Sequence, residues 1–195
     1  IYKLIININL YFYIRMKILL SYPRSGNHLV RFFIELLSET PTFGIDNNKK
    51  DIEIYKNKFS EFIPFNIDKN KEYRKNICYC KKHRSPRKPS SELIFIIRNP
   101  KEVLLRQSNY EMNIDGKKYS FNSYFDLIDY YLQSNCKKLI LFYENILNNK
   151  IEFINKIFDF LSIDNIEKKK YVINNIEKLW NLSLNATGRS WKGNL

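Results

Sequence analysis

The chain has 195 residues, 44% of them hydrophobic and 15% aromatic, and a formal net charge of +13. This length fits one domain with a sizeable core, and the apolar content excludes a disordered chain. The charge indicates an anionic ligand or partner, or it reflects only the Lys-, Asn- and Ile-rich bias of AT-rich coding. Cys78, Cys80 and Cys136 show no disulfide pattern and no second metal-binding pair, so we expect a reducing compartment and no metal.

Residues 1–15, which read IYKLIININLYFYIR, precede the first methionine, Met16. They are apolar, but Asn7 and Asn9 interrupt them and a membrane span needs about 20 residues. They are translated upstream sequence, a fragment boundary or the stub of a membrane anchor, and the first two are favoured. We therefore expect one domain over 16–195 in the cytoplasm, with a secretory-lumen enzyme truncated at its N-terminus as the alternative.

Three strand-then-helix units follow along the chain. The strands are predicted at 17–22, 92–98 and 137–144, and the first leads through a loop at 23–27 into a helix near 28–38. Amphipathic helices are predicted at 120–134 and 165–184, and residues 40–91 are expected to form helices and loops that shape an acceptor pocket. Nearly continuous apolar strands that alternate with helices are typical of a parallel sheet covered on both faces. The expected fold is therefore α/β, with three layers (α/β/α) and a central parallel sheet.

Polar and charged residues stand where these strands end, at Pro23 to Asn27, at Arg98 and at Tyr143-Glu144. Ligands of open α/β sheets bind beyond the carboxyl ends of the strands, so the three groups should converge. The helix after the second strand has a clear start, because Asn99 suits the N-cap, Pro100 the first helical position and Glu102 the position three after the cap.

The loop Arg24-Ser25-Gly26-Asn27-His28 has the features of an anion site. Glycine permits close backbone approach, and the first amides of the following helix have no partner within it. Ser25, Asn27 and His28 carry side-chain donors, and Arg24 adds a fixed positive charge. The lysine and serine or threonine of the usual nucleoside-triphosphate loop are absent. An ordinary strand-to-helix turn with a capping side chain is the alternative.

The segment Tyr22-Pro-Arg-Ser-Gly-Asn-His-Leu29 resembles the 5′-phosphosulfate loop of the sulfotransferases that use 3′-phosphoadenosine 5′-phosphosulfate (PAPS), which reads Y-P-[KR]-S-G-[TN]-x-[WL]. The segment IFIIRNPKEV at 94–103 is similar to that family's 3′-phosphate motif, R-[ND]-P-[KR]-[DE]-V after a strand. LILFYENILNN, at 139–149, is similar to its third motif. The resemblance spans about residues 16–163 and implies a P-loop-NTPase-like sulfotransferase fold.

The resemblance also implies roles for individual residues. Arg24 stands where the family usually has a catalytic lysine, and Ser25, Gly26, Asn27 and His28 would cradle the 5′-phosphate. Arg98 would hold the 3′-phosphate and Tyr143 would contact the adenine. Arg106 stands where the family often has a serine that helps to hold the same phosphate.

His83 is the candidate general base, because Lys81-Lys82-His83 resembles the family's K-[ST]-H and histidine accepts protons near neutral pH. The implied reaction is in-line transfer of a sulfuryl group from PAPS, without a metal, to a hydroxyl or amine of a small-molecule or glycan acceptor. No nucleic-acid partner is expected. No association with a membrane is expected either, unless residues 1–15 are an anchor stub. The alternatives are a non-catalytic relative that binds a nucleotide or an anionic polymer, and another phosphate-loop enzyme such as a nucleotide kinase.

Overall fold

The structure is a computed structural model that describes residues 17–40, 42, 79–87, 89–108 and 121–186. Its internal contacts divide the chain into two compact units. The first, the sheet unit, contains residues 1–27 and 79–144, and the second, the helical unit, contains residues 28–78 and 145–195.

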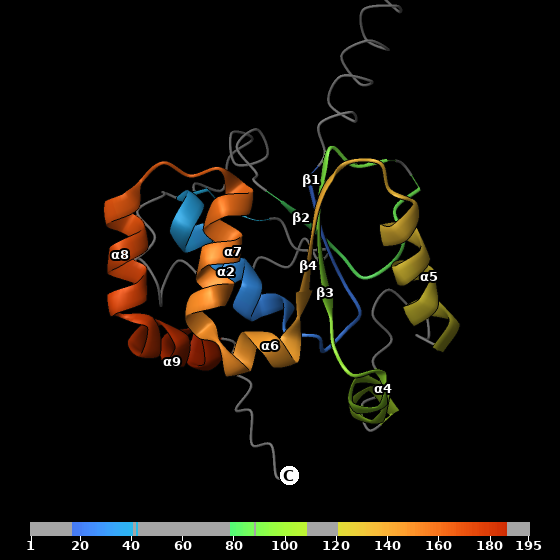
Figure 1. Cartoon of the computed structure of the whole chain (residues 1–195). Helices are drawn as coiled ribbons and strands as arrows, with labels where there is room; N and C mark the ends of the chain where they lie inside the picture. Colours follow the sequence, from blue (N-terminus) through green and yellow to red (C-terminus); the bar gives the residue numbers. More distant parts are fainter. Residues whose placement is uncertain (1–16, 41, 43–78, 88, 109–120, 187–195) are drawn as a thin grey trace, which may run out of the picture. The chain divides into compact units, whose positions relative to one another are not determined.

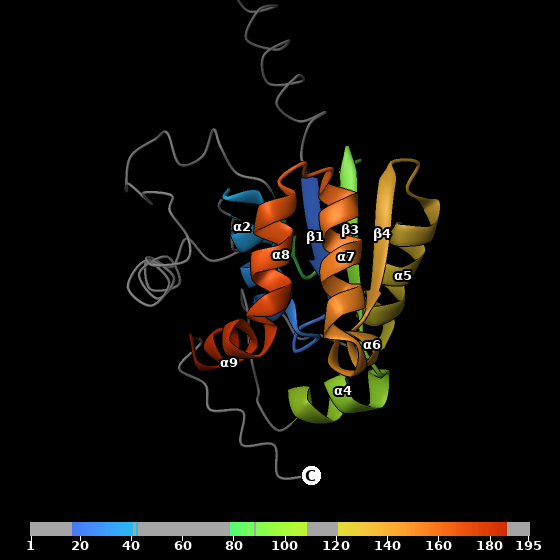
Figure 2. The same ribbon diagram turned by 60° about the vertical axis from the view of Figure 1, so that its left-hand side comes forward.

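The sheet unit is built on four parallel strands in the order β2-β1-β3-β4. The strands are β1 (Lys17–Ser21), β2 (Cys80–Lys82), β3 (Glu92–Ile97) and β4 (Lys137–Phe142), and Figures 1 and 2 show the three longer ones side by side. The predicted α/β class with a central parallel sheet is thereby confirmed. The sequence did not predict β2, because three residues reading Cys-Lys-Lys carry no apolar run.

The two inner strands, β1 and β3, are almost wholly apolar and buried, as expected for strands covered on both faces. Leu19 of β1 lies opposite Ile94 of β3, which lies opposite Leu139 of β4. Two helices, α4 (Pro100–Ser108) and α5 (Phe121–Gln133), lie to the right of the sheet in Figure 1. They close a core on one sheet face, made of Ile18, Leu20, Tyr22, Leu93, Phe95, Val103, Tyr124 and Leu127.

The strand order creates a switch point between β1 and β3. The chain leaves β1 for β2 on one side, and it leaves β3 for β4 on the other. Where neighbouring parallel strands send their connections in opposite directions, a crevice opens beyond their carboxyl ends. The loop after β1 and Arg98 after β3 are the residues that the sequence places there.

The helical unit has a separate aromatic core. Its helices are α2 (Asn27–Ser38), α6 (Tyr143–Asn148), α7 (Lys150–Leu161), α8 (Ile166–Asn174) and α9 (Ile176–Ala186), of which α2 and α6 begin in the sheet unit. The ring of Phe33 lies 5.6 Å from that of Phe153 and 5.7 Å from that of Trp180, centroid to centroid. Such aromatic pairs add to the stabilisation from burial alone.

The predicted helix at 165–184 is wrong in one respect, because it is two helices separated at Asn175. The backbone N–H and the side-chain amide of Asn175 both donate to the carbonyl of Tyr171, which ends α8. The carbonyl of Asn175 then accepts from the N–H of Leu179 in α9. Asparagine competes with helical backbone bonding through its side chain, and this explains the break. None of the described helices is long and apolar enough to cross a membrane.

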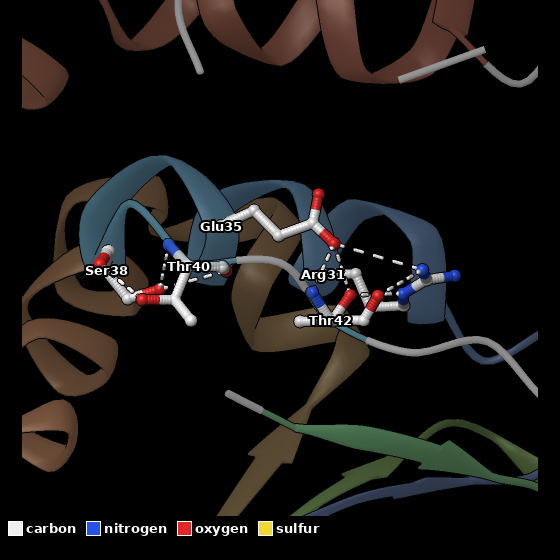
Figure 3. Close-up of polar contacts among 5 residues, drawn as sticks. All are labelled: Arg31, Glu35, Ser38, Thr40 and Thr42. Atoms are coloured by element: carbon white, nitrogen blue, oxygen red, sulfur yellow. Dashed lines mark hydrogen bonds and ion pairs between the residues drawn. The ribbon is translucent and has the colours of Figure 1, made fainter. Parts of the chain in front are cut away.

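A buried polar cluster holds the chain after α2 (Figure 3). Nε of Arg31 donates to Oγ1 of Thr42 at 2.7 Å, and the backbone N–H of Thr42 donates to Oε1 of Glu35 at 2.9 Å. Burial raises the pKa of Glu35, although Arg31 and the hydrogen bonds from Thr42 act in the opposite direction. These contacts pair two buried charged side chains with each other and with Thr42, and they attach residue 42 to the helix.

Candidate functional site

The loop between β1 and α2 begins with a tight turn. The backbone N–H of Ser25 donates to the carbonyl of Tyr22 at 3.3 Å, with Pro23 and Arg24 between them. Arg24 has a φ of 69° and Gly26 a φ of 87°. Proline followed by a residue with positive φ is the pattern of a type II turn, in which glycine or asparagine normally occupies the place of Arg24. An arginine here costs about 1 kcal/mol or more of backbone strain, which is common at functional sites.

Gly26 is required for a reason that the sequence did not reveal. A Cβ atom at this position would overlap with Cδ2 and Cε2 of Tyr143. The tyrosine ring therefore lies against the bare backbone of the loop. The close approach at this glycine is made by the ring of Tyr143, whereas the sequence led us to predict it for a ligand.

Two buried side-chain atoms of the loop have no hydrogen-bond partner in the described part of the chain. The side chain of Ser25 is fully buried and that of Asn27 nearly so, at 0% and 4% exposed. Neither Oγ of Ser25 nor Oδ1 of Asn27 has a hydrogen-bond partner among the described residues. A buried hydroxyl without a partner costs about 1–3 kcal/mol, so such groups in proteins usually mark a ligand or water site. Both lie at the beginning of α2, where the unpaired helical amides attract anions.

His83 is buried directly after β2 and is held by the end of β1. Its Nδ1 lies 2.7 Å from the backbone oxygen of Ser21 and 3.4 Å from Oγ of the same residue. A carbonyl oxygen can only accept, so Nδ1 carries the proton and donates. The neutral ring then has its lone pair on Nε2, the form that can take a proton from a substrate. Oγ of Ser21 also accepts from Nδ2 of Asn27, at 2.8 Å.

Arg98 follows β3 directly and joins the other motifs. NH1 donates to the backbone oxygen of Arg24 at 3.1 Å, which connects β3 to the loop across the switch point. Nε and NH2 donate to Oε2 of Glu102 at 3.2 and 2.5 Å. The guanidinium also lies 4.2 Å from the centroid of the Tyr143 ring, in cation–π geometry. The three predicted motifs therefore meet at a single guanidinium.

The backbone of Arg98 is fixed as well. Its carbonyl accepts a hydrogen bond from the hydroxyl of Tyr124 at 2.6 Å. Burial is the main cause of the raised pKa of Tyr124, and the charge of Glu144 adds to it, while the bond to the carbonyl opposes it. A tyrosine with a raised pKa stays protonated and remains a hydrogen-bond donor at neutral pH.

The start of α4 differs from the predicted capping arrangement. Oδ1 of Asn99 accepts from the N–H of Lys101 at 3.0 Å, so the N-cap itself is as predicted. In a capping box Glu102 would accept from the N–H of Asn99. Oε1 of Glu144 accepts from that N–H instead, at 2.8 Å, and Glu102 binds Arg98. The glutamate after Tyr143 thus ties the third motif to the second.

The structure brings most of the predicted site residues to one edge of the sheet. Arg24, Ser25, Gly26, Asn27, His83, Arg98 and Tyr143 all lie at the carboxyl ends of the strands. His28 is half-buried as the second residue of α2, and the side chain of Arg106 lies outside the described part of the chain. Residues 43–78, most of the predicted acceptor region, also lie outside it.

Sequence reasoning did not select Ser21, Tyr124 or the partner roles of Glu102 and Glu144. The spacing of Arg98 and Glu102, four residues apart across the start of α4, is a local signal that could have indicated an ion pair. Across the described ranges, no three His, Cys, Asp or Glu side chains are placed to hold a metal ion.

No family model matches the chain, and no curated protein matches it. Among solved structures, the chain is similar to the crystal structure of an unliganded sugar kinase from a Janibacter species. The two are 10% identical with a TM-score of 0.37, over 77% of this chain and 96% of that one. A likeness at this level carries no argument about function.

Proposed function

We propose that the protein is a PAPS-dependent sulfotransferase that acts on a hydroxyl or amine of a small-molecule or glycan acceptor. The observation that carries the proposal is the fully buried hydroxyl of Ser25, which has no partner among the described residues, at the helix N-terminus beside a switch point. This arrangement suits the oxygens of a phosphate, which accept hydrogen bonds and gain from the helix dipole.

The position and tautomer of His83 favour sulfuryl transfer over other anion chemistry. The carbonyl of Ser21, directly before the loop, orients the ring so that Nε2 carries the lone pair. A proton acceptor attached to the anion loop is what transfer to a hydroxyl needs. Phosphate transfer from ATP would instead use Mg²⁺ and a lysine in the loop, and the chain has Arg24 and Ser25 there.

The residues then have distinct tasks. PAPS, when bound, supplies a sulfuryl group whose leaving group is a 5′-phosphate. His83 takes the proton of the acceptor at Nε2 as the acceptor oxygen or nitrogen attacks sulfur and the bond from sulfur to the bridging oxygen breaks. Arg24 and the first amides of α2 stabilise the negative charge that grows on the departing phosphate. Arg98 is the candidate for the 3′-phosphate, where Glu102 would compete for the same guanidinium.

The test compares thermal stabilisation by adenosine 3′,5′-bisphosphate with that by ATP and Mg²⁺. At a hundredfold excess over its dissociation constant, a specific ligand stabilises the fold by about 2.7 kcal/mol. For a chain of this size that is a shift of roughly 5–10 °C in Tm. We expect the shift with the bisphosphate, and a shift with ATP and Mg²⁺ alone would refute the proposal.

Transfer of labelled sulfate from PAPS to a panel of phenols, sugars and amines then tests catalysis. His83→Ala should lower turnover by about 10²- to 10⁴-fold and leave bisphosphate affinity unchanged. Bisphosphate binding by the unmodified protein without transfer to any acceptor would identify a non-catalytic binding protein.

A further inference from the structure

Ser21, the last residue of β1, contacts both halves of the candidate site and has so far no task of its own. Its backbone oxygen accepts from Nδ1 of His83, and its hydroxyl oxygen accepts from Nδ2 of Asn27. All three side chains are buried, at 0%, 5% and 4% exposed for Ser21, His83 and Asn27. A single residue therefore bridges the candidate base and the first residue of α2.

We infer that Ser21 is a positioning residue that couples the orientation of the His83 ring to the state of the phosphate loop. The inference deepens the proposed function and rests on it for the role of His83. The backbone oxygen of Ser21 sets the tautomer, and the hydroxyl transmits the position of Asn27 to the ring. Such supporting contacts are what hold a catalytic side chain in its productive geometry.

The positions of the atoms show how the Ser21 hydroxyl would act on the His83 ring. With Nδ1 as the donor, both the backbone oxygen and Oγ of Ser21 lie on the protonated side of the ring, at 2.7 and 3.4 Å. Nδ2 of Asn27 holds Oγ in place at 2.8 Å. If an anion draws Asn27 toward itself, Oγ of Ser21 moves with it and the imidazole shifts. The ordinary alternative is a buried strand serine that only satisfies its neighbours.

Two isosteric variants separate these alternatives. Ser21→Thr keeps the hydroxyl and Ser21→Val replaces it with a methyl group of the same shape, and both introduce β-branched residues that suit a strand. Any cost of the added bulk in this fully buried place is shared by the pair. A difference between the two variants therefore reports the hydroxyl alone.

The first measurement is spectroscopic and requires neither a bound nucleotide nor an activity assay. The chain has only two histidines, so ¹⁵N spectra of histidine-labelled protein give two ring systems, and His83→Asn assigns them. We expect His83 to be protonated at Nδ1. Asn27→Ala should shift its ring signals in the parent protein and in the Ser21→Thr variant, and not in the Ser21→Val variant. A ring protonated at Nε2, or an equal response in all three proteins, would overturn the inference.

The second measurement is kinetic. Ser21→Val should lower kcat for sulfate transfer by about tenfold, which is a fraction of the 10²- to 10⁴-fold contribution of a well-placed base. The comparison is made at saturating PAPS, because the hydroxyl also holds Asn27 in the loop and its loss should weaken bisphosphate binding as well. Ser21→Thr, which keeps the hydroxyl, should have a kcat about tenfold higher than that of Ser21→Val. Equal kcat values for the two variants would also overturn the inference. Failure of the unmodified protein to bind the bisphosphate would instead refute the proposed function, and the ring spectra would still decide the role of Ser21.

Discussion

Replacement of Ser25 by alanine should change stability and binding in opposite directions. The Ser25 hydroxyl is fully buried without a partner among the described residues, so it costs the ligand-free protein about 1–3 kcal/mol. Ser25→Ala removes that cost and leaves a void the size of one oxygen atom. We expect the free energy of unfolding to rise by about 1 kcal/mol, which is roughly 2–4 °C in Tm.

Binding of adenosine 3′,5′-bisphosphate should weaken in the same variant. A hydrogen bond to a charged phosphate oxygen contributes about 1.5–3 kcal/mol. Its loss corresponds to an increase of roughly 10- to 150-fold in Kd. Chemical denaturation without ligand and calorimetric titration with the bisphosphate measure the two effects separately.

Ser183→Ala is the matched control, because Ser183 is also buried but donates to the carbonyl of Trp180 at 2.7 Å. That variant should lose about 0.5–1.5 kcal/mol of stability and keep its affinity for the bisphosphate. If Ser25→Ala also destabilises the protein and leaves the affinity unchanged, the Ser25 hydroxyl is not a ligand contact and the reasoning is refuted.

Three further variants test two other parts of the site and one ion pair at the opposite edge of the sheet. Arg24→Gly relieves the strain of a φ of 69° but raises the conformational entropy of the unfolded chain, so the free energy of unfolding should change by no more than about 1 kcal/mol. Sulfate transfer should fall at least about 100-fold, and intact transfer would exclude Arg24 from catalysis. Arg98→Lys leaves one ammonium where a guanidinium joins Glu102 to the loop, so bisphosphate should bind about tenfold or more weakly in calorimetry, and unchanged binding would contradict the assignment. Although burial opposes it, hydrogen bonds and the charge of Lys17 lower the pKa of Glu92, so its stabilisation is present above about pH 5 and is lost as the pH falls through the folded-state pKa. Urea denaturation should therefore show Glu92→Gln less stable at pH 7 by up to about 1 kcal/mol, with the difference shrinking as the pH is lowered below about 5. A difference that stays constant with pH would count against this account.

The sequence predicted the main strands and the edge at which the candidate site forms. Long apolar strands and the cap at Asn99 are signals carried by neighbouring residues in the sequence. The carboxyl ends of parallel strands lie at the same edge of a sheet, which fixes the position of the site. The short β2 has no such signal, and its residues pair because β1 offers an open edge. The partners of Asn99 and Gly26 could not be predicted either. Glu144 and Tyr143 lie far away in the chain, and only the strand order β2-β1-β3-β4 brings them near. The sulfotransferase activity, the PAPS specificity and the acceptor are predictions.

The bond between Asn27 and Ser21 closes the loop into a small ring. Its two ends are tied together at 2.8 Å, and between them Arg24 and Gly26 already hold left-handed conformations. On the proposed function, the loop would therefore lose little conformational freedom on binding an anion, as a preorganised receptor does. Capture of the bisphosphate should then follow a single fast phase whose rate falls with added salt, as expected when diffusion and charge limit the encounter rather than ordering of the chain.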